Sequence, residues 1–429
     1  MRWLLVALAG MVLATGAAAA PPAGKDAGSE ARAIRKRRVD VLLPQALEQH
    51  GFDAWLVFTR ENSRDPIAED IAGGDVVARS AFLFARTPKG FRKTAIVASY
   101  DVTPVKDSGI YDDIIVYRGE GLKPHLKKVM AELNPKRVAV NISRDIPLAD
   151  GLTVGMRDYL LETLGADWAA RLASAQPLVV SFRGRRLPEE VALLREAATY
   201  TDKIIREALS DKVITPGKTT ENDVAAYLRR RTEEFGATVP FLSVVVGPAR
   251  GHAEPSDRVI QPGDVVRIDF GITHRGYSTD IQRTAYILKP GETDAPAELK
   301  KMWEVNRRAV DAAIAVMKPG VTGLEVDTAG RKVITDAGYE GYPHGGGHAI
   351  GFDVHDVGPM LGPDWPERYG STVFLKLEKD QTFAVEPLIY ARFNGDDINI
   401  SIEEDVVVTA DGVERLHPRQ DALILIPSR

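Results

Sequence analysis

The sequence predicts an α+β protein in which a smaller amino-terminal α/β domain precedes a larger carboxy-terminal domain. In residues 31–175, apolar runs of strand length alternate with segments of helix length, which is typical of α/β folds. In residues 188–429, helical segments are combined with strands joined by short turns, which indicates helices packed over antiparallel strands. The 429 residues are enough for two domains of ordinary size.

The amino-terminal domain, residues 31–175, shows no catalytic pattern. Its helices are expected at 31–50, with Pro44 as a candidate kink, and at 123–133. Its strands are expected at 54–59, 81–85, 94–98, 113–117 and 137–142.

The carboxy-terminal domain follows a connector that is expected at residues 174–187. A helix is predicted to begin at Pro188, which is followed by two acidic residues in the first turn. A second helix is predicted after Thr220, with Asp223 completing a capping box. Two more helices are expected at 297–317 and 323–337.

Residues 1–20 have the pattern of a secretory signal peptide. Arg2 supplies the positive charge, residues 3–13 the apolar segment and residues 15–20 the small side chains of a cleavage site. We therefore expect cleavage after Ala19 or Ala20 and export to the periplasm or beyond. The alternative is an uncleaved anchor, but the residues after 13 are too weakly apolar for a good membrane span.

The composition narrows the classes of function. The chain has no cysteine, which excludes disulfide bonds and thiolate metal ligands. The formal net charge of −5 gives no support for nucleic-acid binding.

A glycine-rich segment, residues 342–359, is the strongest functional signal. It holds three of the eight histidines in the chain, namely His344, His348 and His355, together with five glycines. Histidine is the commonest metal ligand and a common proton carrier near neutral pH. The alternative is a glycine-rich turn with solvated imidazoles, so the interpretation depends on acidic residues elsewhere.

Two aspartates lie in a predicted hairpin. Asp269 interrupts an apolar strand at 265–270, residues 271–278 form the connection, and Asp280 lies near the start of a second strand at 279–288. Antiparallel pairing can bring both carboxylates to one face, where they can share an ion. The alternative pairs Asp269 with Arg267 or Arg283.

Two glutamates complete the acidic set. Glu386 interrupts an apolar run just before Pro387, and Glu403 falls on the polar side of a strand whose isoleucines alternate with polar residues. Together with His348, the set is one imidazole and four carboxylates. Such oxygen-rich donors suit Mn²⁺, with Zn²⁺, Co²⁺ and Fe²⁺ as alternatives, and two dications would relieve the repulsion between the carboxylates.

The order and spacing of these motifs resemble the pita-bread metallopeptidases, and the stretches PHGGGHAIGFDVHDVG and IEEDVVVT are most similar to the Xaa-Pro aminopeptidase and prolidase branch. The resemblance covers residues 188–424. It implies a pita-bread (creatinase/aminopeptidase) catalytic domain in residues 188–429 after a creatinase-like amino-terminal domain. It also implies two divalent ions, Mn²⁺ first, bound by Asp269, Asp280, His348, Glu386 and Glu403.

The resemblance further assigns roles. Asp280 and Glu403 would bridge the two ions, Glu386 would carry a proton, and three histidines would face the substrate, namely His252, His344 and His355. The implied activity is hydrolysis of the amino-terminal residue from a peptide, at Xaa-Pro bonds, by a hydroxide held between the ions. The implied assembly is a homodimer, with no membrane contact after signal removal.

Two alternatives stay open: a metal-free amidinohydrolase related to creatinase, and a catalytically silent protein on the same scaffold. Both are expected to lack some of the metal ligands, and this chain has the complete set. Three positions depart from the family's usual pattern, namely Leu388, Ser401 and Ala349. Because they leave the ligands intact and alter the substrate pocket, strict Xaa-Pro specificity is less firmly implied than amino-terminal hydrolysis.

Overall fold

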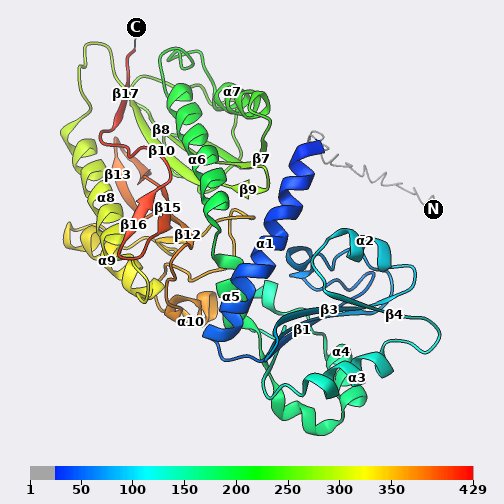
Figure 1. Cartoon of the computed structure of the whole chain (residues 1–429). Helices are drawn as coiled ribbons and strands as arrows, with labels where there is room; N and C mark the ends of the chain where they lie inside the picture. Colours follow the sequence, from blue (N-terminus) through cyan, green and yellow to red (C-terminus); the bar gives the residue numbers. More distant parts are fainter. Residues whose placement is uncertain (1–24, 429) are drawn as a thin grey trace, which may run out of the picture.

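The computed structural model describes residues 25–428, and the expected signal peptide at residues 1–20 lies outside the described residues. The chain forms two parts, a smaller amino-terminal one and a larger carboxy-terminal one (Figure 1). None of the described helices combines the length and the apolar character that a membrane span requires.

The amino-terminal part is built on one mixed sheet with the strand order β4-β3-β2-β1-β5-β6. The central strand β1 pairs antiparallel with β2 and parallel with β5. The strands are β1 (Ala54–Thr59), β2 (Ser80–Thr87), β3 (Gly90–Ala98), β4 (Asp113–Tyr117), β5 (Val138–Val140) and β6 (Leu172–Ser174).

Helices cover both faces of this sheet. Trp55 and Val57 of β1 pack into the apolar cluster that includes α1 (Lys25–Gln49) and α5 (Gln176–Gly184). Leu56 and Phe58, on the opposite face, pack against α3 (Lys123–Leu133) and α4 (Val154–Leu164). Successive strand residues point to opposite faces, so a strand that is covered twice is apolar throughout. The α/β prediction for this part is therefore confirmed.

Three helices of this part were not predicted: α2 (Val102–Asp107), α4 and α5. The expected connector contains α5, whose residues from Leu178 to Gly184 are all buried. A helix of nine residues is also shorter than the window of about 11 or more residues in which a helical period is recognised. Helix α1 begins at Lys25, before the predicted residue 31, and stays helical through Pro44.

The carboxy-terminal part has four long helices: α6 (Pro188–Ala208), α7 (Glu221–Glu234), α8 (Ala297–Val316) and α9 (Gly323–Asp336). Figure 1 shows α6 and α7 on one side of the strands and α8 and α9 on the other. The predicted capping box is present, because Thr220 Oγ1 accepts from the Asp223 amide at 3.1 Å and Asp223 Oδ2 accepts from the Thr220 amide at 2.8 Å.

The strands between these helices form two sheets and a separate hairpin. The first sheet contains β7 (Thr238–Val246), β8 (Val265–His274), β9 (Tyr277–Ser278), β10 (Ile281–Ile287) and β17 (Ile424–Ile426). The second contains β11 (Gly347–Ala349), β12 (Thr382–Val385), β15 (Glu404–Val408) and β16 (Val413–Arg415). The hairpin is β13 (Leu388–Phe393) with β14 (Asp396–Ser401).

The predicted connection at 271–278 was wrong in extent. Strand β8 continues to His274, because Ile272 is fully buried, and the turn consists of Arg275 and Gly276, both with positive φ. This pair of conformations is that of a tight hairpin turn. The second strand then begins at Ile281, two residues later than expected, which leaves Asp280 in an irregular link.

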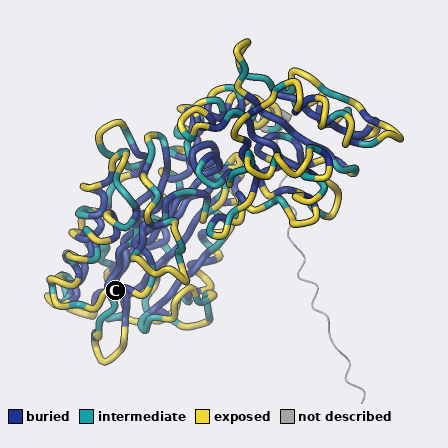
Figure 2. The backbone as a smooth tube through the Cα atoms, turned by 90° about the horizontal axis from the view of Figure 1, so that it is seen from below, coloured by how far each residue is buried: buried dark blue, intermediate teal, exposed yellow. Residues whose placement is uncertain are grey.

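The apolar core is continuous between the two parts. One cluster of buried side chains includes Leu43 of α1, Phe182 of α5, Leu194 of α6 and Phe270 of β8. Figure 2 shows buried backbone through the middle of both parts and exposed backbone at their outer loops. The helices α1 and α5 therefore hold the amino-terminal sheet against the strands that carry Asp269.

Candidate metal centre

Seven of the eight predicted site residues line one cavity of about 750 Å³ in the carboxy-terminal part; they are His252, Asp269, Asp280, His344, His348, His355 and Glu386. The eighth, Glu403, is fully buried next to four of them. The site is therefore assembled from two sheets and the loops between them.

The two aspartates reach the cavity from the first sheet. On β8, Val266, Ile268 and Phe270 are buried in the core, so the alternating Asp269 points to the other face. Asp269 lies opposite Gln282 of β10. At Gly271, an added Cβ would stand 2.1 Å from the Thr279 carbonyl oxygen, so only glycine lets the link with Asp280 approach β8 this closely.

His348 and Glu386 come from the second sheet. His348 of β11 lies opposite Ala384 of β12, and the Glu386 amide donates to the Gly346 carbonyl at 2.8 Å. A Cβ on Gly347 would stand 2.2 Å from the Ala384 carbonyl oxygen, which explains a glycine at this position.

The orientation of the His348 ring suits a metal ligand. Its Nδ1 lies 3.2 Å from the Ala349 carbonyl oxygen, to which it can donate. Its Nε2 then faces the acidic side chains, 3.4 Å from Asp280 Oδ2 and 3.9 Å from Glu386 Oε1. Burial lowers the pKa of His348 to about 3, so the ring stays neutral and keeps a free lone pair.

Glu403 lies between β14 and β15, beneath the cavity. Its amide donates to the Gln282 carbonyl oxygen at 3.2 Å, which ties it to β10. Neither of its buried carboxylate oxygens has a hydrogen-bond donor, and Asp280 Oδ1 lacks one as well. Buried polar atoms are nearly always partnered, so these oxygens mark a place where a cation or a proton belongs.

The electrostatics of the four carboxylates lead to the same conclusion. Burial and then neighbouring carboxylates raise the pKa values of Asp280 and Glu403 well above their ordinary range. Burial raises the pKa of Asp269 to about 6, while burial and then Asp269 raise that of Glu386 to about 8. Within residues 25–428, no lysine or arginine nitrogen lies within 4 Å of these four side chains. The residues therefore fit one or more divalent cations.

The ligand atoms fall into three overlapping groups, each within 4.8 Å: Asp280 with His348 and His355; His348 with Glu386 and Glu403; and Asp269 with Asp280 and Glu403. The last two groups share only Glu403. Each of these two groups could hold a cation, and Glu403 contributes to both.

The three remaining histidines lie around the mouth of this cavity. The His355 ring centroid is 4.1 Å from that of His348, and His252 Nδ1 is 3.6 Å from Asp269 Oδ2. His344 is partly buried, with its Nδ1 2.6 Å from the Gly345 carbonyl oxygen. Burial lowers the pKa of His344 and of His355, so both rings are neutral near pH 7.

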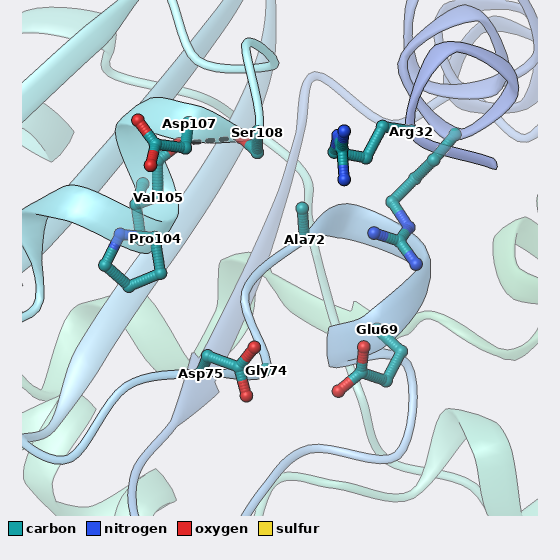
Figure 3. Close-up of a pocket in the computed structure, with 10 residues that line it drawn as sticks. Arg32, Glu69, Ala72, Gly74, Asp75, Pro104, Val105, Asp107 and Ser108 are labelled. Carbon is teal, nitrogen blue, oxygen red and sulfur yellow. Dashed lines mark hydrogen bonds between the residues drawn. The ribbon is translucent and has the colours of Figure 1, made fainter. Parts of the chain in front are cut away.

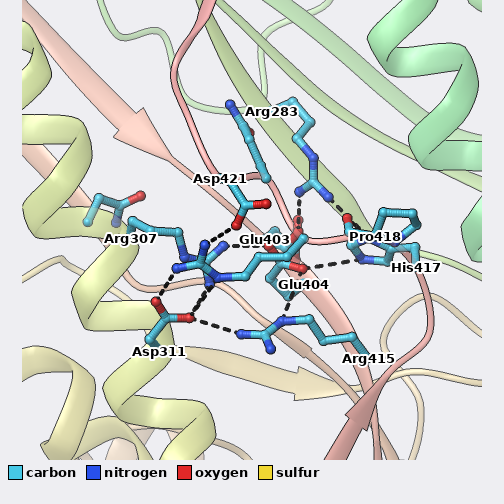
Figure 4. Close-up of polar contacts among 12 residues, drawn as sticks. Arg283, Arg307, Asp311, Glu403, Glu404, Arg415, His417, Pro418 and Asp421 are labelled. Atoms are coloured by element: carbon cyan, nitrogen blue, oxygen red, sulfur yellow. Dashed lines mark hydrogen bonds and ion pairs between the residues drawn. The ribbon is translucent and has the colours of Figure 1, made fainter.

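The adjacent glutamate, Glu404, belongs to a different network (Figure 4). Its carboxylate lies 2.5 Å from Arg307 Nη1, 3.6 Å from Arg415 Nε and 3.9 Å from His417 Nε2. Arg283 connects the two networks, because it donates to the Glu403 carbonyl oxygen at 2.7 Å and lies 3.1 Å from His417 Nδ1. In the described residues neither Arg283 nor Arg267 forms an ion pair with Asp269 within 4 Å, although the charge of Arg267 opposes the rise that burial causes in the pKa of Asp269.

Several cavity residues were missed in the sequence. Gln282 is two positions after Asp280 and shares its face, so strand alternation could have found it. Arg267 could have been found in the same way from Asp269. Arg368 and Tyr369, on the short helix α10 (Pro366–Tyr369), carry no sequence signal that links them to the site.

A second cavity, of about 460 Å³, lies in the amino-terminal part (Figure 3). Its lining mixes charges of both signs, with Arg32 and Arg35 from α1, Asp107 from the end of α2, and Glu69 and Asp75 from the segment between β1 and β2. It contains no histidine, and the possible metal-binding groups in residues 25–428 all lie at the first cavity.

Comparisons with known proteins agree with this geometry. The sequence profile of Metallopeptidase family M24 matches residues 192–410, about half of the chain. The chain is 33% identical over 288 residues to the probable dipeptidase PepE of Mycobacterium bovis, covering 66% of this chain and 67% of the relative. It is 30% identical over 243 residues to the Xaa-Pro dipeptidase of Pyrococcus horikoshii, covering 55% of this chain and 63%, less than two thirds, of that protein.

The structure is also similar to that of the Xaa-Pro dipeptidase from Bacillus anthracis, with a TM-score of 0.65 and 26% identity over 91% of this chain and 99% of the other. This similarity extends through both parts of the chain. It confirms the expected pita-bread fold with an additional domain before it.

Proposed function

Because the chain belongs to Metallopeptidase family M24, we propose that it is a dinuclear metal-dependent peptidase that removes the amino-terminal residue of peptides at Xaa-Pro bonds. The observation that carries the proposal is the cluster of four carboxylates and His348 at this cavity, in which no carboxylate has a lysine or arginine nitrogen within 4 Å in the described residues. The names of the relatives supply the substrate class, since two of them are described as Xaa-Pro dipeptidases.

The chemistry of the candidate ligands also favours particular metal ions. One imidazole and four carboxylates form an oxygen-rich set, which favours Mn²⁺ among the candidate ions. When bound, two divalent cations would lower the pKa of a shared water and polarise the scissile carbonyl.

The chain's own residues then handle protons and orient the substrate. Glu386 borders the cavity and is held by Gln282 Nε2 at 3.2 Å, so it can take a proton from the attacking water and pass it to the leaving nitrogen. His355 is exposed beside His348, where it can donate a hydrogen bond to the developing oxyanion. His252 and His344 line the same cavity and can orient the peptide.

The test is an assay of purified, Mn²⁺-supplemented protein against Xaa-Pro dipeptides, Xaa-Pro-Xaa tripeptides and proline-free controls, with EDTA treatment as the control for metal. We expect cleavage of the Xaa-Pro bonds, loss of activity in EDTA and recovery with Mn²⁺. Cleavage of none of the peptides by protein of confirmed metal content would favour the silent scaffold. Equal cleavage of the proline-free controls would contradict the Xaa-Pro assignment.

We also propose that the protein is exported, on the basis of the signal-like pattern in residues 1–20. Mass spectrometry of the amino terminus of the protein from fractionated cells tests this proposal. We expect a chain that begins at Ala20 or Pro21, and an intact amino terminus in the cytosolic fraction would contradict it. The homodimer stays a prediction from the family resemblance.

A further inference from the structure

Arg267 differs from every other buried arginine in the described residues. Six arginines are at most 7% exposed: Arg38, Arg183, Arg186, Arg267, Arg283 and Arg307. Five of them have a carboxylate oxygen within 2.8 Å. Arg267 has no carboxylate within 4 Å, and its hydrogen bond within residues 25–428 is donation to the Gly251 carbonyl oxygen at 3.3 Å. A guanidinium stays charged at all ordinary pH values, so a buried one without a partner needs an anion.

Strand β8 places the Arg267 side chain at the cavity of the candidate metal centre. Arg267 and Asp269 are two residues apart on β8, with their side chains on the face opposite Val266 and Ile268, and both line the cavity. Arg267 therefore lies on the same cavity wall as Asp269, two residues farther along β8 from the link that carries Asp280.

Two uncharged polar side chains lie in the same cavity as the Arg267 guanidinium. Tyr390 and Asn399 lie opposite each other on the hairpin of β13 and β14, and both line the same cavity. Among the residues that the structure describes, neither the Tyr390 hydroxyl nor the Asn399 amide has a hydrogen-bond partner, although Asn399 is only 6% exposed. Both can donate to an acceptor in the cavity.

The acidic cluster supplies no ion pair to this guanidinium, because the charge of Asp269 acts on Arg267 from more than 4 Å away. Under the proposed function, the four carboxylates hold the metal ions, which leaves Arg267 free to pair with a carboxylate of the ligand. A bidentate pair between guanidinium and carboxylate is the strong form of such a contact.

We propose that Arg267, with Tyr390 and Asn399, forms a subsite for a carboxylate of the peptide substrate. This inference rests on the proposed function and makes the substrate class more specific. The carboxylate has two possible sources: an acidic side chain on the amino-terminal residue, or the free carboxyl terminus of a dipeptide.

Four peptides distinguish the two sources: Glu-Pro-amide against Gln-Pro-amide for the side chain, and Ala-Pro against Ala-Pro-amide for the carboxyl terminus. We expect the wild type to prefer the carboxylate in one of the two pairs. Arg267→Gln is expected to lower that preference in kcat/KM by about 10- to 100-fold. Arg267→Lys, which keeps the charge without the bidentate geometry, should retain part of it.

Two further arginines serve as controls. Arg308→Gln, on the exposed face of α8, removes one positive charge far from the cavity and should leave the preference unchanged. Arg368→Gln tests the other arginine of the cavity, which is exposed and packs its guanidinium against Trp365 and Tyr369. Loss of the preference in Arg368→Gln, with Arg267→Gln unaffected, would overturn the proposal. So would a wild type without any preference, or an equal loss on all four peptides in Arg267→Gln.

Binding is measured as well as turnover. Isothermal titration calorimetry of the same peptides with Mn²⁺-loaded Glu386→Gln protein, with and without Arg267→Gln, should show the same change in the ratio of dissociation constants. If the wild type cleaves none of the peptides, the proposed function fails, and the calorimetric ratio still decides the role of Arg267. A ratio that Arg267→Gln leaves unchanged would overturn that role.

Discussion

Glu386→Gln should raise the free energy of unfolding when metal is absent. It should also reduce the stability that the protein gains when metal binds. The pKa of Glu386 rises from an ordinary 4.5 to about 8, first through burial and then through the nearby Asp269. In free energy this change is about 5 kcal/mol. Because the folded pKa lies above the unfolded one, the stability that this proton confers is complete below pH 4.5 and is lost as the pH rises through about 8. Glutamine has nearly the same shape as a protonated glutamate but has no ionisable proton to lose, so this loss of stability does not occur in the variant.

The assay is urea unfolding at pH 9, in EDTA and in saturating Mn²⁺. In EDTA, we expect Glu386→Gln to be more stable than wild type by about 2–5 kcal/mol, the lower values reflecting relaxation of the other carboxylates. In Mn²⁺, the order should reverse, because ions that bind the native state stabilise it and the variant lacks one ligand. A variant that is less stable than wild type in EDTA would refute the reasoning.

Glu404→Gln is the matched control. Glu404 is also a buried glutamate, but Arg283, His417 and Arg307 outweigh the effect of burial and lower its pKa. Its replacement should therefore destabilise the protein in both conditions.

Three further predictions test the supporting structure. Arg307→Met should lower the free energy of unfolding by about 3–5 kcal/mol in urea, because it leaves Glu404 buried without its 2.5 Å partner; a loss below about 1 kcal/mol would contradict this. Gly271→Ala should cost about 1–3 kcal/mol and weaken Mn²⁺ binding in a metal titration, because the new methyl group meets the Thr279 carbonyl oxygen; unchanged affinity would count against the role of this close approach. Asp356→Asn should lower kcat/KM by about 10-fold or more at unchanged metal content, because Asp356 anchors the His355 loop to Arg183 and Arg186 at 2.8 Å. The control for this variant is Asp353→Asn, whose side chain is 61% exposed and contacts only Arg183, and an equal loss in both variants would contradict the anchoring role.

The sequence predicted the elements that have a clear local signal. The helices that begin at Pro188 and Thr220 start where capping chemistry places them, and β1 and β4 have the predicted bounds. Helix α5 was not predicted because its nine residues are fewer than the window of about 11 or more in which a helical period is recognised. The turn at Arg275 was misplaced because Gly271, which serves close packing, resembled a turn glycine.

The candidate site also contains residues that the sequence predicted and features that it could not predict. Its acidic residues were predicted because acids such as Asp269 and Glu386 interrupt apolar strands, a local conflict that sequence alone reveals. Strand alternation and the family pattern favoured Glu403 over Glu404, and the structure adds that Glu404 is held by Arg307 and His417 from other elements. The missing partner of Arg267 could not be predicted, because one sequence does not show which carboxylates fold next to it.

Elemental analysis of the purified protein after dialysis against Mn²⁺ is the decisive test of the proposed metal centre. We expect two divalent ions per chain in the wild type, and fewer in Glu403→Gln, whose carboxylate is shared by two of the groups that could hold a cation. A wild-type protein that retains no ion, or a Glu403→Gln protein that retains as many as the wild type, would contradict it.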